Sequence, residues 1–576
     1  MGLARTRHVP VRVSLILFGC TLFGGALAGA RAWGVETADR IYYGGTILTV
    51  NDRSPTAAAL AIASGKILAV GGKAEVFRHK SSSTEMVDLA GHALVPGFID
   101  PHSHFLNALQ VVGWANVSAP PVGQVTSIYD VVAELKRVQE RDNPAPGDWI
   151  IGYGYDASTL KERRDITRDD LDPAFPDHPV MLIHVSNHGC VLNSAGFKKV
   201  GVDAGTKTPA GGVIMRKPGS EEPAGLLMEN AFLPIFAALP KPSTEALLAA
   251  MKPAQEQYAR AGYTTIQEGA TQFGDLNLLR QAAEQKLFYL DLVAIPFFTD
   301  AARIVGQPGN DFGVYHNRLK LGAVKCIADG SPQGKTAYWS QPLATAGPVG
   351  QRPWRGEPNM TQAAIDEMYA LCYRHDVRVF THANGDAAID MALAAHRKAA
   401  GDGKSDRRPV MIHSQFARPD QLEQFVRLGV QPSFFTNHAF FWGDVHVQNL
   451  GRDRAYFLSP MRTAERLGLR GTNHTDYTVT PLDPLFTMWT AVNRVSRSGE
   501  VIGIQERITT AEALRALTIH AAYQYGEEQS KGSLEVGKLA DLVILSDNPL
   551  AVEPMHLRSV RVLTTVKEGA VVFTAP

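Results

Sequence analysis

The sequence predicts an α/β protein: a (β/α)8 TIM barrel with an inserted cap subdomain, plus a small β-sandwich domain built from both terminal flanks. Three observations support this fold class. Apolar strand-like segments alternate with helical segments over residues 96–495. Both flanks, 31–95 and 496–576, consist of short apolar runs separated by turn signals. Residues that can bind metal follow several of the central strands, at the end where a barrel carries its active site.

The first residues of the chain differ from the rest. Within residues 1–30, Arg5, Arg7 and Arg12 precede the apolar run VSLILFGCTLFGGALA, which ends in small residues. This pattern predicts a secretory signal peptide that is cleaved just after the run. The run is short for a membrane span, which needs about 20 apolar residues, and a retained anchor is the alternative. We therefore expect a secreted or periplasmic protein with no stable membrane association after cleavage.

The two flanks are predicted to form one domain. In residues 31–95 the runs IYYGGTILTV, AALAIASGKILAVGG and MVDLAGHALV contain turn pairs such as Ser64-Gly65. In residues 496–576 a terminal helix is expected before the strand-like runs KGSLEVGKLADLVILSDNP and SVRVLTTVKEGAVVF. Because both flanks have the same character, we expect their strands to share one β-sandwich, with the barrel inserted in it.

The middle of the chain supplies the barrel. After PGFIDPHSHF the strand-like segments are YTTIQEG, FYLDLVAIP, RLKLGAVKCIADG, VRVFTHANGD, PVMIHSQF, GVQPSFFTNH and LRGTNHTDYTV. Segments between them, such as STEALLAAMKPAQEQYARAG, repeat apolar residues at helical spacing. Eight strand-plus-helix units predict a (β/α)8 barrel.

One connection between barrel strands, at about residues 113–241, is far longer than the others. It contains its own helix, beginning after Ser127, and its own strands DWIIGYGYD and VMLIHVSNHG. A loop of this length without structure of its own would be unusual in a compact domain. We interpret it as a cap subdomain over the mouth of the barrel.

The composition limits the class of partner. Lys+Arg and Asp+Glu are both 57, so the net charge gives no reason to expect nucleic acid or an anionic membrane as a partner. After signal cleavage the cysteines are Cys190, Cys326 and Cys372, an odd and widely spaced set that implies no disulfide framework. The expected partner is a small molecule. The sequence does not decide between a monomer and a homo-oligomer.

Several central strands end in a residue that can bind a metal ion. His102 and His104 follow the first strand, and both rings should project together because alternate residues of a strand face the same side. His382, His413 and Asp476 follow the strands VRVFTHANGD, PVMIHSQF and LRGTNHTDYTV. Any one of them alone could be structural, but together they predict a site for one or two divalent ions. We expect Zn2+, and the same ligands also suit Mn2+, Fe2+ or Co2+.

Lys325 lies inside the apolar run of RLKLGAVKCIADG, before Asp329. Burying an ammonium group is unfavourable, and such a group is seldom left unpaired. A lysine can avoid this by losing its proton and reacting with carbon dioxide, which gives a carbamate able to bridge two cations. An ordinary ion pair with Asp329 or another acid is the alternative.

The motifs PGFIDPHSHF, VKCIADGSPQGKTA, THANGDAAID, VSNHGCVLNSAG, TVTPLDPLFTMWTAVNR and KGSLEVGKLADLVIL extend over most of the chain. Together they resemble the amidohydrolase superfamily, and most closely its YtcJ-like (amidohydrolase 3) branch, over about residues 40–573. The resemblance implies a composite β-sandwich, a barrel that holds one or two divalent ions, and hydrolysis of an amide-type C–N bond.

The resemblance also implies roles for single residues. The histidine pair after the first strand would bind one ion, and the other two histidines would bind the second. Carboxylated Lys325 would bridge the ions, and Asp476 would also be the catalytic residue that carries the proton. The implied metal ligands are His102, His104, Lys325, His382, His413 and Asp476.

Two segments depart from the commonest pattern of the branch. GDAA stands where GDRA is frequent, which removes a positive charge that could contact a substrate carboxylate. NHTDYT stands where SDxP is frequent, which adds His474 beside Asp476. His188 in SNHGC, His438 in FFTNHAFFWGD and His474 are candidates for substrate binding, and a structural role is the alternative for each.

The predicted activity is hydrolysis of a non-peptide C–N bond, of the amide, formamide or N-acyl type, by a metal-activated hydroxide. Asp476 would take a proton during the attack and deliver it to the leaving nitrogen. Deamination, or hydrolysis of a lactone or dipeptide, is an alternative on the same scaffold. Nucleobase deaminases of this scaffold place a glutamate shortly after the equivalent of His382, which is followed here by ANGD. A secreted metal- or ligand-binding protein without turnover is the alternative from another class.

Overall fold

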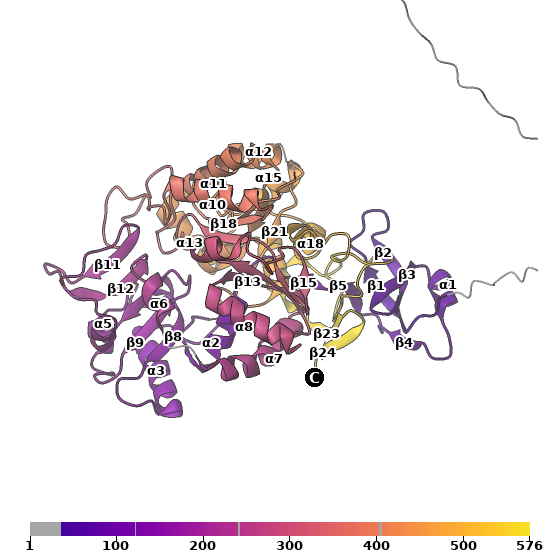
Figure 1. Ribbon diagram of the computed structural model, residues 1–576, viewed down its shortest axis with the longest axis horizontal. Helices are drawn as coiled ribbons and strands as arrows, with labels where there is room; N and C mark the ends of the chain where they lie inside the picture. The colour runs from indigo at the N-terminus through magenta and orange to yellow at the C-terminus, as the bar shows by residue number, and fades with distance from the viewer. Residues whose placement is uncertain (1–35, 121, 240–241, 402–405) are drawn as a thin grey trace, which may run out of the picture. The chain divides into compact units, whose positions relative to one another are not determined.

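The structure is a computed structural model, which describes residues 36–120, 122–239, 242–401 and 406–576 (Figure 1). The predicted signal peptide, residues 1–30, lies outside the described residues. In the described ranges no helix is both long enough and apolar enough to cross a membrane.

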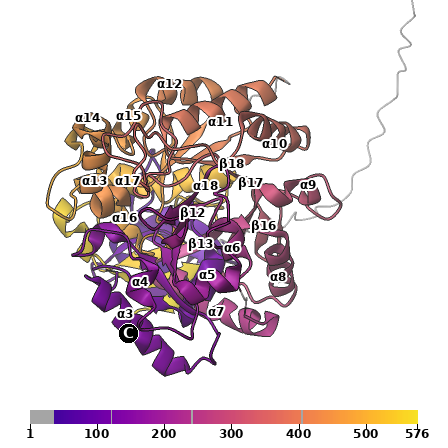
Figure 2. The same ribbon diagram turned by 90° about the vertical axis from the view of Figure 1, so that its left-hand side faces the viewer.

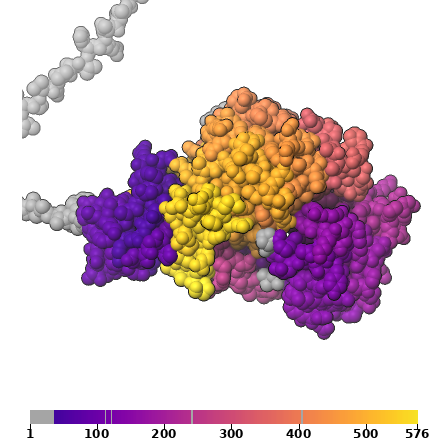
Figure 3. Space-filling view, turned by 180° about the vertical axis from the view of Figure 1, so that it is seen from behind, coloured from indigo at the N-terminus to yellow at the C-terminus, as the bar shows by residue number. Residues whose placement is uncertain are grey.

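Strands from both flanks form one 8-stranded sheet. Its members are β1 (Arg40–Leu48), β2 (Thr56–Ala63), β3 (Lys66–Gly71), β4 (Glu85–Asp88), β5 (Ala93–Pro96), β22 (Leu542–Leu545), β23 (Val562–Lys567) and β24 (Ala570–Thr574). The strand order is β24-β23-β22-β5-β1-β2-β3, and β4 also pairs with β1. The antiparallel pairing of β22 with β5 joins the two flanks directly. Figure 3 shows the indigo and yellow segments side by side.

The predicted turn between β2 and β3 is confirmed. Ser64 and Gly65 connect the two antiparallel strands and have φ values of 50° and 76°. A two-residue hairpin of type I′ needs positive φ at both central positions, which glycine adopts without steric cost. The local sequence therefore fixes the register of this hairpin.

The central strands follow one another in parallel order, as predicted for the barrel. They are β6 (Phe98–Ile99), β13 (Tyr263–Thr271), β14 (Asp291–Pro296), β16 (Leu319–Leu321), β17 (Val324–Ile327), β18 (Val379–Ala383), β19 (Val410–His413), β20 (Gln431–Phe434) and β21 (Thr472–Asn473). They form two 5-stranded sheets, one ordered β16-β14-β13-β6 with the antiparallel β15 (Tyr315–His316) at its edge, the other β17-β18-β19-β20-β21. A parallel bridge between Phe297 and Lys325 links the two sheets.

The fourth predicted strand differs from the expectation of one continuous strand. It divides into β16 and β17, with Gly322 and Ala323 between them. A Cβ atom on Gly322 would lie 2.5 Å from Cγ1 of Val293, so the chain passes β14 at a distance that only glycine allows. The segment bends there, and its two halves pair with different neighbours.

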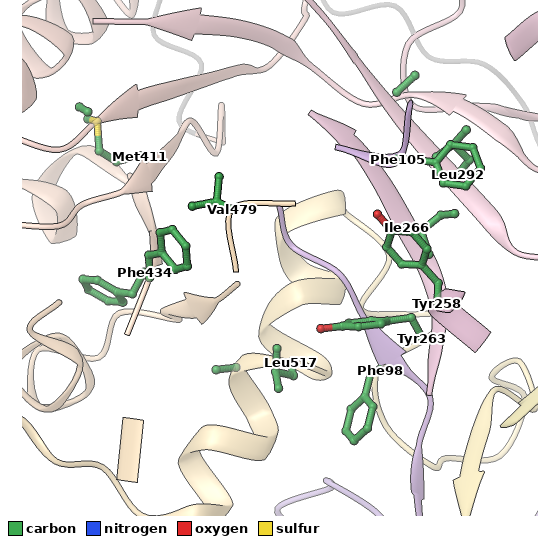
Figure 4. Close-up of a cluster of buried hydrophobic side chains, with 14 of the residues drawn as sticks. Phe98, Phe105, Tyr258, Tyr263, Ile266, Leu292, Met411, Phe434, Val479 and Leu517 are labelled. Carbon is green, nitrogen blue, oxygen red and sulfur yellow. The ribbon is translucent and has the colours of Figure 1, made fainter. Parts of the chain in front are cut away.

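Helices surround these strands, as Figures 1 and 2 show. The longer ones are α7 (Thr244–Arg260), α8 (Phe273–Glu284), α10 (Gln362–Arg374), α11 (Asp386–Ala399), α12 (Pro419–Leu428), α13 (Asn437–Leu450) and α16 (Pro484–Asn493). One buried cluster contains residues of both sheets: Phe98, Tyr263 and Leu292 from one, and Met411 and Phe434 from the other (Figure 4). Each such side chain stabilises the fold by about 1.5–3 kcal/mol.

The long connection between β6 and β13 has a sheet of its own, seen from its outer side in Figure 2. Its 6 strands have the order β11-β12-β10-β9-β8-β7. They are β7 (Ala115–Asn116), β8 (Ile150–Tyr155), β9 (Val180–His184), β10 (Gly189–Leu192), β11 (Gly212–Arg216) and β12 (Pro223–Glu229). The predicted helix is α3 (Ile128–Asp142), and the side chain of Ser127 caps it by accepting from the N–H of Asp130. We call residues 114–239 the inserted domain.

Candidate active site

A pocket of about 900 Å³ opens where the parallel strands end. Its lining combines polar residues that follow the strands with apolar residues of the inserted domain, such as Trp114 and Phe236. The polar part includes every predicted metal ligand: His102, His104, Lys325, His382, His413 and Asp476.

The first group of ligands surrounds one oxygen of Asp476. Its Oδ1 lies 3.5 Å from Nε2 of His102 and 3.4 Å from Nε2 of His104. Nζ of Lys325 lies 2.9 Å from the same nitrogen of His102. Ligand atoms of the two histidines and Asp476 all lie within 4.8 Å of one another, close enough for one ion to contact all three.

The second group is formed by His382, next to last in β18, and His413, the last residue of β19. Nδ1 of His382 lies 3.0 Å from Nε2 of His413, so their ring nitrogens face each other. Nδ1 of His413 lies 3.9 Å from Oδ2 of Asp476. Asp476 therefore lies between the two groups of histidines.

A buried amide orients His102. Its Nδ1–H donates to Oε1 of Gln267 at 2.6 Å, which leaves Nε2 with its lone pair toward Lys325 and Asp476. Gln267 is fixed in turn, since its amide nitrogen donates to the carbonyl of Pro101 at 2.9 Å and to the hydroxyl of Tyr525. Our sequence interpretation missed Gln267; the only signal was an amide inside the buried run YTTIQEG.

Asp329, the alternative partner of Lys325, is engaged elsewhere. Its carboxylate accepts the backbone N–H groups of Tyr338, Asn384 and Gly385 at 2.8–2.9 Å. The ion pair between Lys325 and Asp329 that we considered is absent from the ion pairs of the described residues. Lys325 is 2% exposed and contacts His102 instead.

Burial sets the charges of the site. It lowers the pKa of His102, His382 and His413 well below the ordinary value, so the rings are neutral near pH 7 and can bind metal. Burial also lowers the pKa of Lys325 to about 8, against the opposing effect of the Asp476 charge. For Asp476 burial raises the pKa, but the neighbouring histidines outweigh it and keep the carboxylate ionised.

These residues fit one or two divalent cations. Among the described residues, Nδ1 of His413, Oδ1 of Asp476 and both ring nitrogens of His474 are buried without a hydrogen-bond partner. Leaving such a group unsatisfied costs about 1–3 kcal/mol, so a native site of this kind calls for a further ligand. Neutral imidazoles around an ionised carboxylate are the donors that zinc and similar ions prefer.

The three candidates for substrate binding have different positions. His188 lines the pocket, and its ring centroid lies 5.0 Å from that of His382. His474 is fully buried, and its ring nitrogen, with atoms of His413 and Asp476, forms a second group of possible metal ligands. His438 is outside the lining described; its Nδ1 lies 3.0 Å from Nε2 of His446, and the two rings stack. The structure thus brings His188 and His474 to the site, but not His438.

The model of the amidohydrolase family matches residues 85–573. The chain belongs to the amidohydrolase family. It is similar to the N-substituted formamide deformylase of Arthrobacter pascens, with 27% identity over 93% of this chain and 98% of the relative. It is 28% identical to the YtcJ protein of Bacillus subtilis (strain 168), over 92% of this chain and 99% of that protein. The predicted YtcJ-like branch is confirmed, and the chain is a metal-dependent hydrolase of C–N bonds.

Solved structures agree on the fold of this amidohydrolase. An uncharacterized metal-dependent hydrolase from Pyrococcus furiosus has a TM-score of 0.69 and 24% identity, over 89% of this chain and 99% of that one. Another from Pyrococcus horikoshii OT3 has a TM-score of 0.70 and 22% identity, over 90% and 99%. At these identities the likeness concerns the fold alone.

Proposed function

We propose that this amidohydrolase cleaves a non-peptide C–N bond of the amide, formamide or N-acyl type, and that an N-substituted formamide is the first substrate to test. The observation that carries the proposal is the convergence of His102, His104 and Asp476 beside the facing pair His382 and His413, inside one pocket. The similarity to a protein named N-substituted formamide deformylase, over 93% of this chain, favours the formamide.

The metal ligands would form two sets. Asp476 lies between these sets, and carboxylated Lys325 would bridge the ions that they hold. A divalent cation bound there would lower the pKa of a water molecule and polarise the scissile carbonyl. We propose Zn2+ and a carbamate on Lys325, whose Nζ lies 2.9 Å from Nε2 of His102 and whose lowered pKa favours the reactive neutral amine. Gln267 would keep the ring of His102 in the tautomer that binds.

Asp476 would carry the proton during hydrolysis. Its carboxylate is ionised and lines the pocket, so it can accept a proton from the attacking water and pass it to the leaving nitrogen. The products are a carboxylic acid, formic acid in the case of a formamide, and an amine.

The inserted domain would act as the predicted cap and bind the substituent of the substrate. Trp114, Leu233 and Phe236 from this domain line the pocket, together with Phe297 and Phe298 after β14. Apolar lining with a few polar groups at one end is typical of small-molecule sites. It suits an amide whose substituent is apolar.

The test combines metal analysis with a substrate panel. The purified protein is stripped with a chelator and reloaded with Zn2+ or Mn2+, while amine and carboxylate release is followed for N-substituted formamides and N-acyl amines. Metal-dependent release of both products is expected. Ammonia released from nucleobases instead would favour a deaminase. Tight ligand binding without turnover under any metal would favour a binding protein.

A further inference from the structure

The inserted domain presents one histidine to the metal-ligand end of the pocket. His188 lies between β9 and β10, lines the pocket, and has a side chain that is 14% exposed. Its ring centroid is 5.0 Å from that of His382, a predicted ligand on β18. A group from a separate sheet thus reaches the edge of the proposed metal site.

A buried glutamate holds this histidine. Glu229 ends β12, is 2% exposed, and its Oε2 lies 2.9 Å from Nδ1 of His188. Because a carboxylate only accepts, Nδ1–H of His188 is the donor. Among the described residues we find no hydrogen-bond partner for Nε2 of His188, so this nitrogen is left for a ligand in the pocket.

Glu229 is also tied to the segment that follows β17. Thr336 donates its hydroxyl to Oε1 at 2.6 Å, and the amide of Asn359 donates to Oε2 at 3.1 Å. A Cβ atom on Gly330 would collide with the carboxylate, so glycine is needed for this close approach. The carboxylate of Glu229 therefore connects the inserted domain to the segment after β17, close to His188.

The backbone of Glu229 is strained. Its φ is 52°, in the left-handed region that non-glycine residues seldom adopt and that costs about 1–3 kcal/mol. Its N–H nevertheless donates to the carbonyl of His188 at 2.8 Å, so backbone and side chain hold the same residue. Such a strained conformation persists only where several surrounding contacts hold the residue in place, and residues of this kind are common at functional sites.

We propose that His188 contacts the scissile amide group of the substrate through Nε2, and that Glu229 is the positioning residue that aims its ring. The inference rests on the proposed function and adds to it that the inserted domain completes the active site. Glu229 itself touches no substrate; it acts through His188.

A double-mutant cycle tests this arrangement in the metal-loaded enzyme. His188→Ala should lower kcat/KM by about 100-fold or more, with metal content and Tm close to wild type. Glu229→Gln should lower kcat/KM by about 10- to 100-fold. In the His188→Ala background, Glu229→Gln should lower kcat/KM no further, because its effect passes through the ring that is gone. Equal losses in both backgrounds would show a scaffolding role and overturn the proposal.

Thr336→Val provides a second variant if Glu229→Gln folds poorly. It removes one hydrogen bond from the carboxylate but keeps the charge, so a smaller loss in kcat/KM is expected, again absent when His188 is alanine. If the wild type turns over a substrate and His188→Ala has the same kcat/KM, this inference is refuted and the proposed function stands. If the wild type turns over no panel substrate, the proposed function fails. Calorimetric titration with acetohydroxamate then still tests whether His188 contacts a ligand in the pocket. His188→Ala should weaken that Kd about 10-fold or more, and an unchanged Kd would refute the contact.

Discussion

Nζ of Lys325 lies 2.9 Å from Nε2 of His102, in the interior of the barrel. Two groups that are both cationic when protonated repel each other at this distance, so they cannot both be charged. Burial lowers the pKa of each, that of Lys325 to about 8. The pair is thus ready to bind a cation or, after carboxylation of the lysine, to share one.

Replacing Lys325 with alanine should remove most of the bound metal and most of the hydrolysis, because it removes the group that faces His102. Short-chain carboxylic acids or bicarbonate should restore part of both, since a small carboxylate can take the place of the carbamate. Metal content and amine release measure the effect, and Lys286→Ala, at an exposed position, is the control. Full metal content and full activity in Lys325→Ala would exclude the carbamate bridge.

Replacing Asp476 with asparagine should preserve the fold and lower kcat by about 100- to 10,000-fold, because an amide cannot accept the proton. The measurement is kcat per bound metal, so that loss of the ion is separated from loss of proton transfer. Asp444→Asn, whose carboxylate accepts from Ser496 and Ser498 away from the pocket lining, is the control. Unaltered turnover per metal would contradict the role of Asp476.

Replacing Gln267 with leucine should weaken metal affinity by about 10- to 100-fold, because the ring of His102 loses the acceptor that fixes its tautomer. Competition with a chromophoric chelator measures the affinity. Gln255→Leu is a matched control, since Gln255 is also fully buried but bonds to the backbone of Met251, Leu287 and Tyr289. Equal affinities in the two variants would show that the contact does not orient the ligand.

A buried ion network ties β14 to the C-terminal flank. The carboxylate of Asp291 accepts from Lys531 at 2.6 Å, from Lys567 at 2.7 Å and from Arg318 at 2.9 Å. Burial raises the pKa of Asp291, but the charges of Lys531 and Lys567 outweigh it and hold the pKa far below the ordinary value. Asp291→Asn should lower the free energy of unfolding by about 3–5 kcal/mol at pH 7, as measured by urea denaturation.

The same carboxylate gives a pH dependence of known sign. A group whose pKa is lowered in the folded state contributes its full share of the free energy of unfolding at pH values above its unfolded pKa, which is about 3.9 for aspartate. That contribution is lost as the pH falls toward the folded pKa, so wild type should lose stability below about pH 5 more steeply than Asp291→Asn. Parallel curves for the two proteins would show that Asp291 is not the group that titrates.

Local patterns were sufficient to predict much of the fold. The Ser127 cap of α3 and the Ser64-Gly65 hairpin depend on neighbours a few residues apart, which the sequence displays directly. Histidines at the ends of β18 and β19 could be predicted for the same reason, since strand and exit are one short segment. The break at Gly322 could not, because its cause is the side chain of Val293 on another strand.

Contacts across long separations explain what the sequence could not reveal about the site. Gln267 lies 165 residues from His102, and no local pattern connects the two. Glu229 and Thr336 are 107 residues apart. His438 is a local exception: it stands at the end of the expected strand GVQPSFFTNH, but it lies in α13 (Asn437–Leu450), and its ring pairs with His446 of the same helix. The helix, not the preceding strand, decides where that ring points.

The shared sheet of the two flanks also has a consequence during synthesis. β5 leaves the ribosome long before β22, its antiparallel neighbour, has been translated. Until then the nascent chain carries an apolar strand edge of the kind that recruits other chains into aggregates. A protein truncated before residue 542 would keep that edge open permanently, so it should precipitate during expression rather than accumulate as an inactive soluble form.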